Sequence, residues 1–281
     1  MRRSLALLAV IIALQLGLAG WLLADHRRGA AEARLAPDLT VVTPSHWRPA
    51  TLGRQITVMT YNLQEGFSRD DRFDLERQAA AIEAEHPDVV VVQEVSRGWL
   101  VAAGADEVLW LSQRLGMQAV FGANSDDGLW GNAILSRAPL QDAAREQYTT
   151  TQNLKRSVVA ARVDTAAGPL WLFGTHLDNP VGATDVRLSQ TRELIRFWNN
   201  RSPALVLGDL NADPGDPVFG LFTSAGLVDL DRQLPPGAST SSDQRLIDHI
   251  LATPNLTLQS IRVPDTWASD HRPLVARVSL P

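Results

Sequence analysis

The chain has 281 residues, of which 45% are apolar and 20% are charged, and this composition excludes an intrinsically disordered protein. It contains no cysteine, which excludes disulfides and thiolate metal sites and leaves oxygen and imidazole as the possible metal ligands. The formal net charge is −5, and because residues 1–49 carry six arginines against three acids, the remainder carries −8, which argues against a protein that grips long nucleic acid by charge alone.

An apolar stretch comes first. Residues 5–23 contain Gln15 as their only strongly polar member, and as a helix they would span about 28 Å, close to the hydrocarbon thickness of a bilayer. Signal peptides have shorter apolar regions, of about 7–15 residues. We therefore predict a transmembrane anchor or a signal peptide over residues 1–24, with a buried soluble helix as a further alternative. We expect the folded domain outside the cytoplasm, membrane-anchored or, after cleavage, secreted or periplasmic.

The next segment, residues 25–53, is rich in alanine and arginine, contains three prolines and is predicted to be a linker. A single folded domain is expected over residues 54–281. It opens with a strand-like run at 55–59 and a helical pattern at 72–85. Residues 88–92, Asp88 followed by four valines, are predicted to form a strand buried on both faces.

The remaining elements alternate in type along the chain. A second helix is expected at residues 105–115 and a strand at 131–137. Two strands at 157–163 and 170–174 flank an Ala-Gly hairpin signal, and a helix follows at 184–200. Further strands are expected at residues 204–207, 246–251, 256–263 and 273–279.

Polar residues of catalytic types recur within or just after these strands. They are Asn62, Glu94, His176, Asp209, Asn211, Asp248, Asp270 and His271. Each one taken singly could be a cap, a turn residue or a structural hydrogen-bond partner. Since sheets place ligand sites at strand ends, the whole set could instead converge on one edge of a sandwich.

The chemistry that suits such a cluster is metal-assisted phosphoester hydrolysis. Glu94 and Asp270 are hard oxygen ligands of the kind that suit Mg²⁺ or Mn²⁺. A carboxylate such as Asp209 would orient and deprotonate the attacking water. A pair such as His271 with Asp248 would hold a charged imidazole against the phosphate. The neighbouring His249 should face away from Asp248 and is interpreted as structural.

Seven short motifs, in this order over residues 55–280, resemble the endonuclease/exonuclease/phosphatase superfamily, and in particular its deoxyribonuclease-like and small bacterial metal-dependent hydrolase members. They are Thr60-Tyr61-Asn62-Leu63, Val92-Gln93-Glu94-Val95, Gly131-Asn132-Ala133-Ile134-Leu135-Ser136, Thr175-His176-Leu177-Asp178, Gly208-Asp209-Leu210-Asn211, Ile247-Asp248-His249-Ile250 and Ser269-Asp270-His271. The resemblance implies an α/β (α+β) fold: a four-layer sandwich in which two mainly antiparallel sheets lie face to face with helices outside.

The resemblance also implies roles for single residues. By position, Asn62 and Asp270 join Glu94 at the metal site. Asp209 and Asn211 resemble the pair that activates water and contacts the phosphate, and Asp248 with His271 resembles the dyad. His176 resembles a histidine that acts near the leaving group. The predicted substrate-binding residues are Asn132 and Arg156, although Arg156 could equally be a solvated hairpin arginine.

These features predict a Mg²⁺- or Mn²⁺-dependent phosphodiesterase acting on nucleic acid or a phospholipid head group. One alternative is a phosphomonoesterase acting on a soluble phosphate such as an inositol phosphate. Another is a catalytically inactive, membrane-anchored binding module. Three tryptophans beside the motifs, Trp99, Trp130 and Trp267, could stack a base, enter a lipid interface or simply pack the sandwich corner. The membrane is an expected partner through the N-terminal helix, and no protein partner is inferred.

Overall fold

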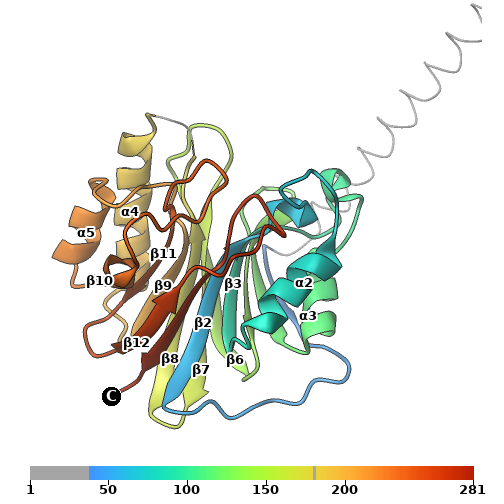
Figure 1. The fold of residues 1–281 in the computed structure, drawn as a ribbon, viewed down its shortest axis with the longest axis horizontal. Helices are drawn as coiled ribbons and strands as arrows, with labels where there is room; N and C mark the ends of the chain where they lie inside the picture. The colour runs from blue at the N-terminus through green and yellow to red at the C-terminus, as the bar shows by residue number, and fades with distance from the viewer. Residues whose placement is uncertain (1–37, 180–181) are drawn as a thin grey trace, which may run out of the picture. The chain divides into compact units, whose positions relative to one another are not determined.

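The computed structural model describes residues 38–179 and 182–281, which form two β-sheets packed face to face (Figure 1). The strands of the first sheet are β1 (Leu39–Val42), β2 (Gln55–Asn62), β3 (Val89–Ser96), β4 (Gln118–Ala123), β5 (Trp130–Ser136), β12 (Thr257–Arg262) and β13 (Leu274–Ser279). Their spatial order is β1-β4-β5-β3-β2-β13-β12. Strands β2 and β3 run parallel, and the other neighbours in this sheet are antiparallel.

The second sheet is also mixed. Its strands are β6 (Leu140–Gln147), β7 (Ser157–Thr165), β8 (Gly168–His176), β9 (Ala204–Asp209), β10 (Val228–Asp229) and β11 (Asp248–Ala252). They lie in the order β10-β11-β9-β8-β7-β6, and β8 and β9 are the parallel pair. Each sheet therefore brings the carboxyl ends of two parallel strands to one edge.

Helices cover the outer faces of both sheets. The helices α2 (Leu75–Ala84) and α3 (Glu107–Leu115) pack against the first sheet, and α4 (Thr184–Trp198) and α5 (Val218–Ser224) pack against the second (Figure 1). Short 3₁₀ turns are η1 (Gln64–Gly66), η2 (Leu100–Ala102) and η3 (Leu230–Gln233). The expected arrangement of two sheets with outer helices is confirmed.

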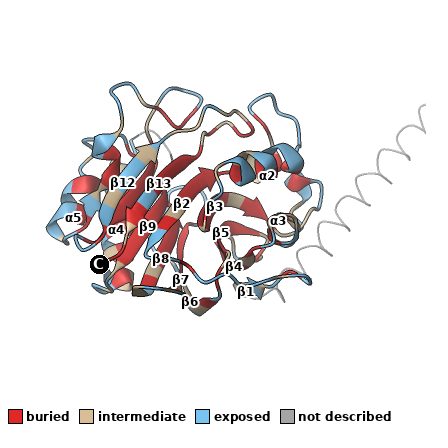
Figure 2. Cartoon of the chain, turned by 60° about the horizontal axis from the view of Figure 1, so that its bottom comes forward, coloured by how far each residue is buried: buried red, intermediate tan, exposed pale blue. Residues whose placement is uncertain are grey.

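The valine run of β3 shows why the strands are buried on both sides. Val89 and Val91 point into the core between the sheets, whereas Val90 and Val92 pack toward α2 and α3. Successive side chains of a strand face opposite sides, so a strand covered on both faces must be apolar throughout. The central strands are accordingly almost entirely buried (Figure 2).

The beginning of the domain differs from the expectation of a linker up to residue 53. Residues Leu39–Val42 form β1, which pairs antiparallel with β4, and Leu52 is buried at 2% exposure. Four residues are too few for a distinct strand signal, and the pairing depends on a partner far along the chain. The predicted anchor over residues 1–24 lies outside the described residues. Among the residues that the structure does describe, none of the helices has the length and apolarity needed to cross a bilayer.

Besides β1, strands β4, β6 and β10 and helix α5 have no counterpart among the predicted elements. Strand β6 has the sequence LQDAAREQ at the edge of its sheet, where one face is open to solvent and the apolar pattern is absent. Strand β4 follows α3 directly, and the seven-residue α5 is too short for a clear helical period.

Candidate active site

Strand pairing brings the polar residues of the second sheet together. His176 ends β8 and lies opposite Asp209, which ends the parallel strand β9. Asp248 begins the antiparallel strand β11 and is also opposite Asp209. Three motifs that are up to 72 positions apart in the chain therefore meet at one edge of the sheet.

The first sheet delivers its polar residues to the same end of the sandwich. Asn62 ends β2 beside the parallel strand β3, which carries Glu94. Strand β13 runs antiparallel to β2 with Leu274 opposite Thr60, so the preceding Asp270 and His271 lie near the end of β2.

One carboxylate oxygen, Oδ2 of Asp209, lies at the centre of the cluster. Asn62 Nδ2 donates to it at 3.1 Å. His176 Nε2 lies 3.4 Å from the same oxygen and His271 Nε2 lies 3.8 Å from it. Asn62 and His271 come from the first sheet and its loops, so this oxygen links the two sheets across the interior.

The backbone next to Asp209 lies unusually close to the neighbouring strand β8. A Cβ at Gly208 would lie 1.9 Å from the carbonyl oxygen of Thr175 on β8, so only glycine permits this spacing. Beyond Asp209 the chain turns: the Asn211 amide donates to Asp209 Oδ1 at 2.9 Å, and Asn211 has a positive φ of 49°. Asparagine tolerates this conformation better than most residues. The turn is the Asx type that such a sequence favours, and it also orients Asp209.

The dyad predicted from Asp248 and His271 is present as a short hydrogen bond of 2.7 Å between Oδ2 and Nδ1. Burial alone would lower the pKa of His271, but the carboxylates of Asp248 and Asp209 outweigh burial and raise it well above 6.5. Burial and the charge of Asp248 raise the pKa of Asp209 to about 6, against the opposing effect of His271. Near neutral pH the site thus holds an Asp209 carboxylate beside a His271 imidazolium.

His176 has the opposite character. Burial, together with the nearby positive charges of Arg156 and His271, lowers its pKa well below 6.5, so the imidazole is neutral. Arg156 Nη1 lies 3.1 Å from Nδ1, and because arginine has only donors, Nδ1 accepts and the ring proton is on Nε2, facing Asp209. Asn211 Nδ2 lies 3.0 Å from Nε2 but donates its hydrogen bond to the Leu177 carbonyl, because a ring nitrogen that carries the proton cannot accept from an amide N–H.

Arg156 is not the solvated hairpin arginine that the sequence left as an alternative. It is 1% exposed, and its guanidinium lies 5.2 Å from the centre of the Trp130 ring. Its Nε has no hydrogen-bond partner among the described residues. A buried cation with an unused donor at the edge of the cluster fits the predicted phosphate contact.

Glu94 occupies a bulge in β3. The register of β3 with β5 shifts between Val92 and Val95, and Glu94 has a positive φ of 53°. Such strain in a non-glycine residue is typical of functional sites. The side chain is 20% exposed, and Oε1 lies 3.8 Å from His176 Nδ1. No described residue donates a hydrogen bond to it.

The residues around Glu94 fit a divalent cation. Burial and the charge of Glu65 raise the pKa of Glu94 to about 7. Burial and the charge of Asp270 also raise the pKa of Glu65. Carboxylates whose charges oppose one another in this way are hard oxygen ligands of the kind that Mg²⁺ or Mn²⁺ prefers. Among the described residues near the cluster, the ligand atoms that already lie within 4.8 Å of one another are those of Asp209, Asp248 and His271. Asn62, predicted at this site, uses its Oδ1 to accept from the Gln64 amide at 3.0 Å.

Glu65 is a site residue that the sequence prediction missed. It lies in η1 with a positive φ of 47°, and its Oε1 accepts a 2.8 Å hydrogen bond from Trp130 Nε1. Its position three residues after Asn62 is the signal that could have indicated it. The Trp130 ring in turn lies 6.2 Å from the ring of His176, centre to centre.

Asn132 makes no hydrogen bond to the residues around Asp209, and its Oδ1 has no partner among the described residues. Its Nδ2 donates to Asn124 Oδ1 and to the Ser157 carbonyl, each at 3.1 Å, so it ties β5 to neighbouring segments. The predicted separation of His249 from Asp248 is observed: the His249 ring contacts Asp231 and the Ala212 carbonyl.

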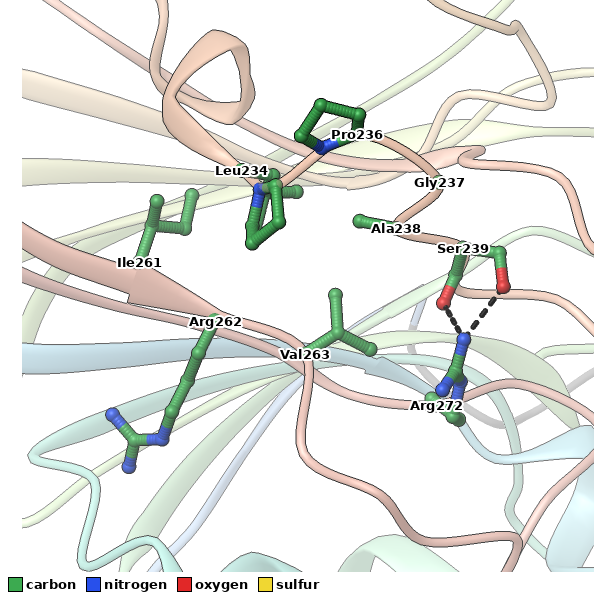
Figure 3. Close-up of a pocket in the computed structure, with 10 residues that line it drawn as sticks. Leu234, Pro236, Gly237, Ala238, Ser239, Ile261, Arg262, Val263 and Arg272 are labelled. Atoms are coloured by element: carbon green, nitrogen blue, oxygen red, sulfur yellow. Dashed lines mark hydrogen bonds between the residues drawn. The ribbon is translucent and has the colours of Figure 1, made fainter.

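A pocket of about 310 Å³ lies between residues 234–239 and the end of β12, with Arg272 in its lining (Figure 3). Apolar side chains including Leu234, Ile261 and Val263 line it. Arg272 donates to both the carbonyl and the hydroxyl of Ser239, and Trp267 is contacted by the guanidinium groups of Arg69 and Arg272. Trp267 therefore packs between arginines.

The chain and its fold are similar to known proteins. The model of the Endonuclease/Exonuclease/phosphatase family matches residues 59–271. The structure resembles an endonuclease/exonuclease/phosphatase from Beutenbergia cavernae, with 26% identity over 81% of this chain and 72% of that chain and a TM-score of 0.69. It also resembles D. rerio TDP2 in complex with single-strand DNA product (20% identity, 80% and 99% of the two chains, TM-score 0.61). A third similar structure is a mannosyl-6-phosphatase from Bacteroides thetaiotaomicron (15% identity, 80% and 100% of the two chains, TM-score 0.64).

Proposed function

The chain belongs to the endonuclease/exonuclease/phosphatase family, and from this premise we propose that it is a metal-dependent phosphodiesterase acting on a nucleic acid or a phospholipid head group. The observation that carries the proposal is the position of Asp209 Oδ2, within 3.1–3.8 Å of Asn62, His176 and His271. The proposed general base, Asp209, therefore lies beside one cationic imidazole and one neutral imidazole.

In the proposed reaction water attacks phosphorus and the bond to the leaving oxygen breaks. Asp209 orients the water and takes its proton, and Asn211 holds the turn that aims Asp209. The His271 imidazolium, fixed by Asp248, stabilises the charge that develops on the phosphoryl oxygens. His176, whose Nε2 lies 3.4 Å from Asp209 Oδ2, would act near the leaving group.

Arg156 would contact a phosphate oxygen through its unused donor. Glu94 and Asp270, with Glu65 and the neighbouring Asn62, would hold the Mg²⁺ or Mn²⁺. A metal bound there supplies positive charge that polarises the phosphoryl group. The role of Asn132 is the least supported, because its amide donates to Asn124 and Ser157 instead.

The test compares the full chain with its Asp209→Ala and His271→Ala variants. We expect each substitution to lower kcat by at least about 100-fold, because both groups act chiefly in the transition state. The assay uses bis-p-nitrophenyl phosphate, p-nitrophenyl phosphate, plasmid DNA and phospholipid vesicles, each with Mg²⁺, Mn²⁺ or EDTA. Full activity in either variant, with folding verified by circular dichroism, would contradict the mechanism.

The same assay decides between the candidate activities. Cleavage of the monoester alone would favour a phosphomonoesterase, for which the similar mannosyl-6-phosphatase is a precedent within the fold. Absence of any hydrolysis with either metal would favour the binding module. For localisation we propose a membrane-anchored protein with the domain outside the cytoplasm, supported by the apolar sequence of residues 5–23.

A further inference from the structure

The loop between β3 and α3 has an unusual composition for an exposed segment. Residues 98–105, GWLVAAGA, contain no charged side chain, and the indole N–H of Trp99 is their only side-chain hydrogen-bonding group. Leu100 is 61% exposed and Val101 is 56% exposed. Exposed loops are normally polar, and contiguous apolar surface marks a contact site. We call these eight residues the apolar loop.

The apolar loop is held in one conformation. Arg97 and Asp106 pair at its base, with Arg97 Nε 3.7 Å from Asp106 Oδ2. Inside it, the Gly98 amide donates to the Ala105 carbonyl at 2.8 Å, and the Gly104 amide donates to the Trp99 carbonyl at 3.0 Å. Binding through Leu100 and Val101 would therefore not require the entropic cost of ordering a flexible loop.

Other exposed apolar side chains lie on the elements next to the loop. Leu109, 41% exposed, is in the first turns of α3, and Val41, 51% exposed, is on β1. Arg97 Nη1 donates to Thr40 Oγ1 at 2.8 Å and so joins the loop base to β1. Of the seven large apolar side chains exposed in residues 38–179 and 182–281, four thus lie on the loop, α3 and β1.

The apolar loop also borders the active site. The Trp99 ring lies 6.0 Å from the Trp130 ring, and Trp130 contacts both His176 and Glu65. A partner surface bound to the apolar loop would therefore lie beside Glu65 and the neutral imidazole of His176.

We propose that the apolar loop inserts into the surface of a lipid bilayer and so presents the active site to phospholipid head groups. The sequence supplies the argument for this occupant. The 19-residue apolar segment 5–23 is separated by 14 residues from Asp38, a distance of at most about 50 Å when extended. If residues 5–23 were embedded in a bilayer, the domain would therefore remain close to that bilayer. The first strand of the domain, β1, contacts the base of the apolar loop.

The charge of the domain favours insertion over electrostatic adsorption. Residues 50–281 carry a formal charge of −8, which is unsuited to binding an anionic membrane surface. Leucine, valine and tryptophan on a rigid projection are instead suited to the interfacial region of a bilayer. Binding through these side chains should persist in about 0.5 M NaCl, where exposed charges are screened.

The absence of cysteine allows a direct test of insertion in the full chain reconstituted into phosphatidylcholine vesicles. Leu100→Cys and the control Val228→Cys, at a 47% exposed position on edge strand β10, each receive one environment-sensitive fluorophore. We expect a blue shift and quenching by doxyl-labelled lipid at position 100 and neither at position 228, with and without salt. Equal quenching at both positions, or none at position 100, would overturn the proposal, as would a blue shift that needs no lipid and grows with protein concentration.

The second measurement rests on the proposed function. The double variant Leu100→Glu/Val101→Glu should hydrolyse phospholipid in vesicles about tenfold more slowly, since charged side chains resist transfer into the bilayer. Hydrolysis of bis-p-nitrophenyl phosphate should be unchanged, and Val228→Glu should affect neither rate. Equal rates on vesicles would contradict a role of the loop in presenting the site. A catalytically inactive protein that still showed quenching at position 100 would contradict the proposed function and leave the insertion intact.

Discussion

Two imidazoles within 4 Å of one carboxylate oxygen have opposite protonation states, and single neighbours set the difference. His271 faces Asp248 at 2.7 Å, which favours the imidazolium. His176 is more deeply buried and faces Arg156 at 3.1 Å, which favours the neutral ring. The chain thus obtains a cation and a neutral hydrogen-bond donor from the same residue type.

Replacing Asp248 with asparagine should move the whole pH profile of kcat/KM to lower pH. Burial and, after it, the charge of Asp248 raise the pKa of Asp209 to about 6, so the loss of that charge lowers the pKa of the base and the acid limb moves down. The same charge raises the pKa of His271, so the alkaline limb, where the imidazolium is lost, also moves down. The measurement is the profile on a soluble diester from about pH 5 to pH 10. An unmoved alkaline limb would show that His271 is not the required acid.

At the scale of elements, the site depends on how closely β8 and β9 approach each other. Gly208 faces the Thr175 carbonyl, with no space for a Cβ. His176 follows Thr175 directly, and Asp209 follows Gly208, so the same close contact sets the separation between the neutral imidazole and the base. The absence of a side chain at Gly208 therefore sets the distance between His176 and Asp209.

The variant Gly208→Ala should lose at least about 3 kcal/mol of unfolding free energy, because the new methyl group requires the two strands to separate. Urea denaturation measures the change. The matched control is Gly220→Ala in α5, where no atom lies within 4 Å of an added Cβ, and this change should stabilise the protein by up to about 1 kcal/mol. Similar stability of the two variants would mean that the strands can separate at little cost.

A second link between elements is the buried pair of His249 and Asp231. His249 Nδ1 lies 2.6 Å from Asp231 Oδ2, and Nε2 lies 2.8 Å from the Ala212 carbonyl, so both ring nitrogens face acceptors. Only an imidazolium satisfies both. The contact joins η3 and β11 to the turn that carries Asp209 and Asn211.

The unfolding free energy should therefore fall as pH rises through the pKa of His249. Burial opposes the charge, but Asp231 outweighs it and raises the pKa of His249 to about 9 from 6.5. The native state then binds more protons than the unfolded state between these values, so stability present below about pH 6.5 is lost by about pH 9, on the order of 3 kcal/mol. Denaturant unfolding at pH 7 and pH 9 should show this loss. Asp231→Asn should reduce it, and an unchanged loss would place the titration elsewhere.

At the scale of the molecule, the strand ends are predictable and their surroundings are not. Apolar runs such as 89–92 lead into polar residues, which indicates that Glu94 lies near the carboxyl end of its strand, but the bulge that carries Glu94 within β3 is not indicated. The distance between Asp209 and His271 depends on pairings across two sheets, and without the family resemblance no local pattern indicates it. Glu65 lies in a strained turn that residue type and spacing alone do not indicate, and the hydrogen bonds of Asn132 Nδ2 to Asn124 and Ser157 depend on strand pairing.

The acids of the proposed metal site lower the stability of the whole molecule. Burial and Glu65 raise the pKa of Glu94 from 4.5 to about 7, so ionised Glu94 is disfavoured in the folded state. Stability should fall as pH rises from about 4.5 to about 7, and at higher pH without metal the cost reaches about 3 kcal/mol. A bound cation offsets this cost, and one present at about 100 times its Kd adds about 2.7 kcal/mol.

The variant Glu94→Gln should consequently be more stable than the natural protein at pH 8 in EDTA and should lose most of the stabilisation by Mg²⁺. Glutamine removes the charge that Glu65 opposes, and it also removes the strongest ligand. Thermal unfolding with and without Mg²⁺ measures both effects independently of activity. Glu146→Gln, at an exposed position on β6, is the control and should behave like the natural protein. If Mg²⁺ stabilised the Glu94 variant as much as the natural protein, the cation would bind elsewhere, and the assignment of Glu94, Glu65 and Asp270 to the metal would be wrong.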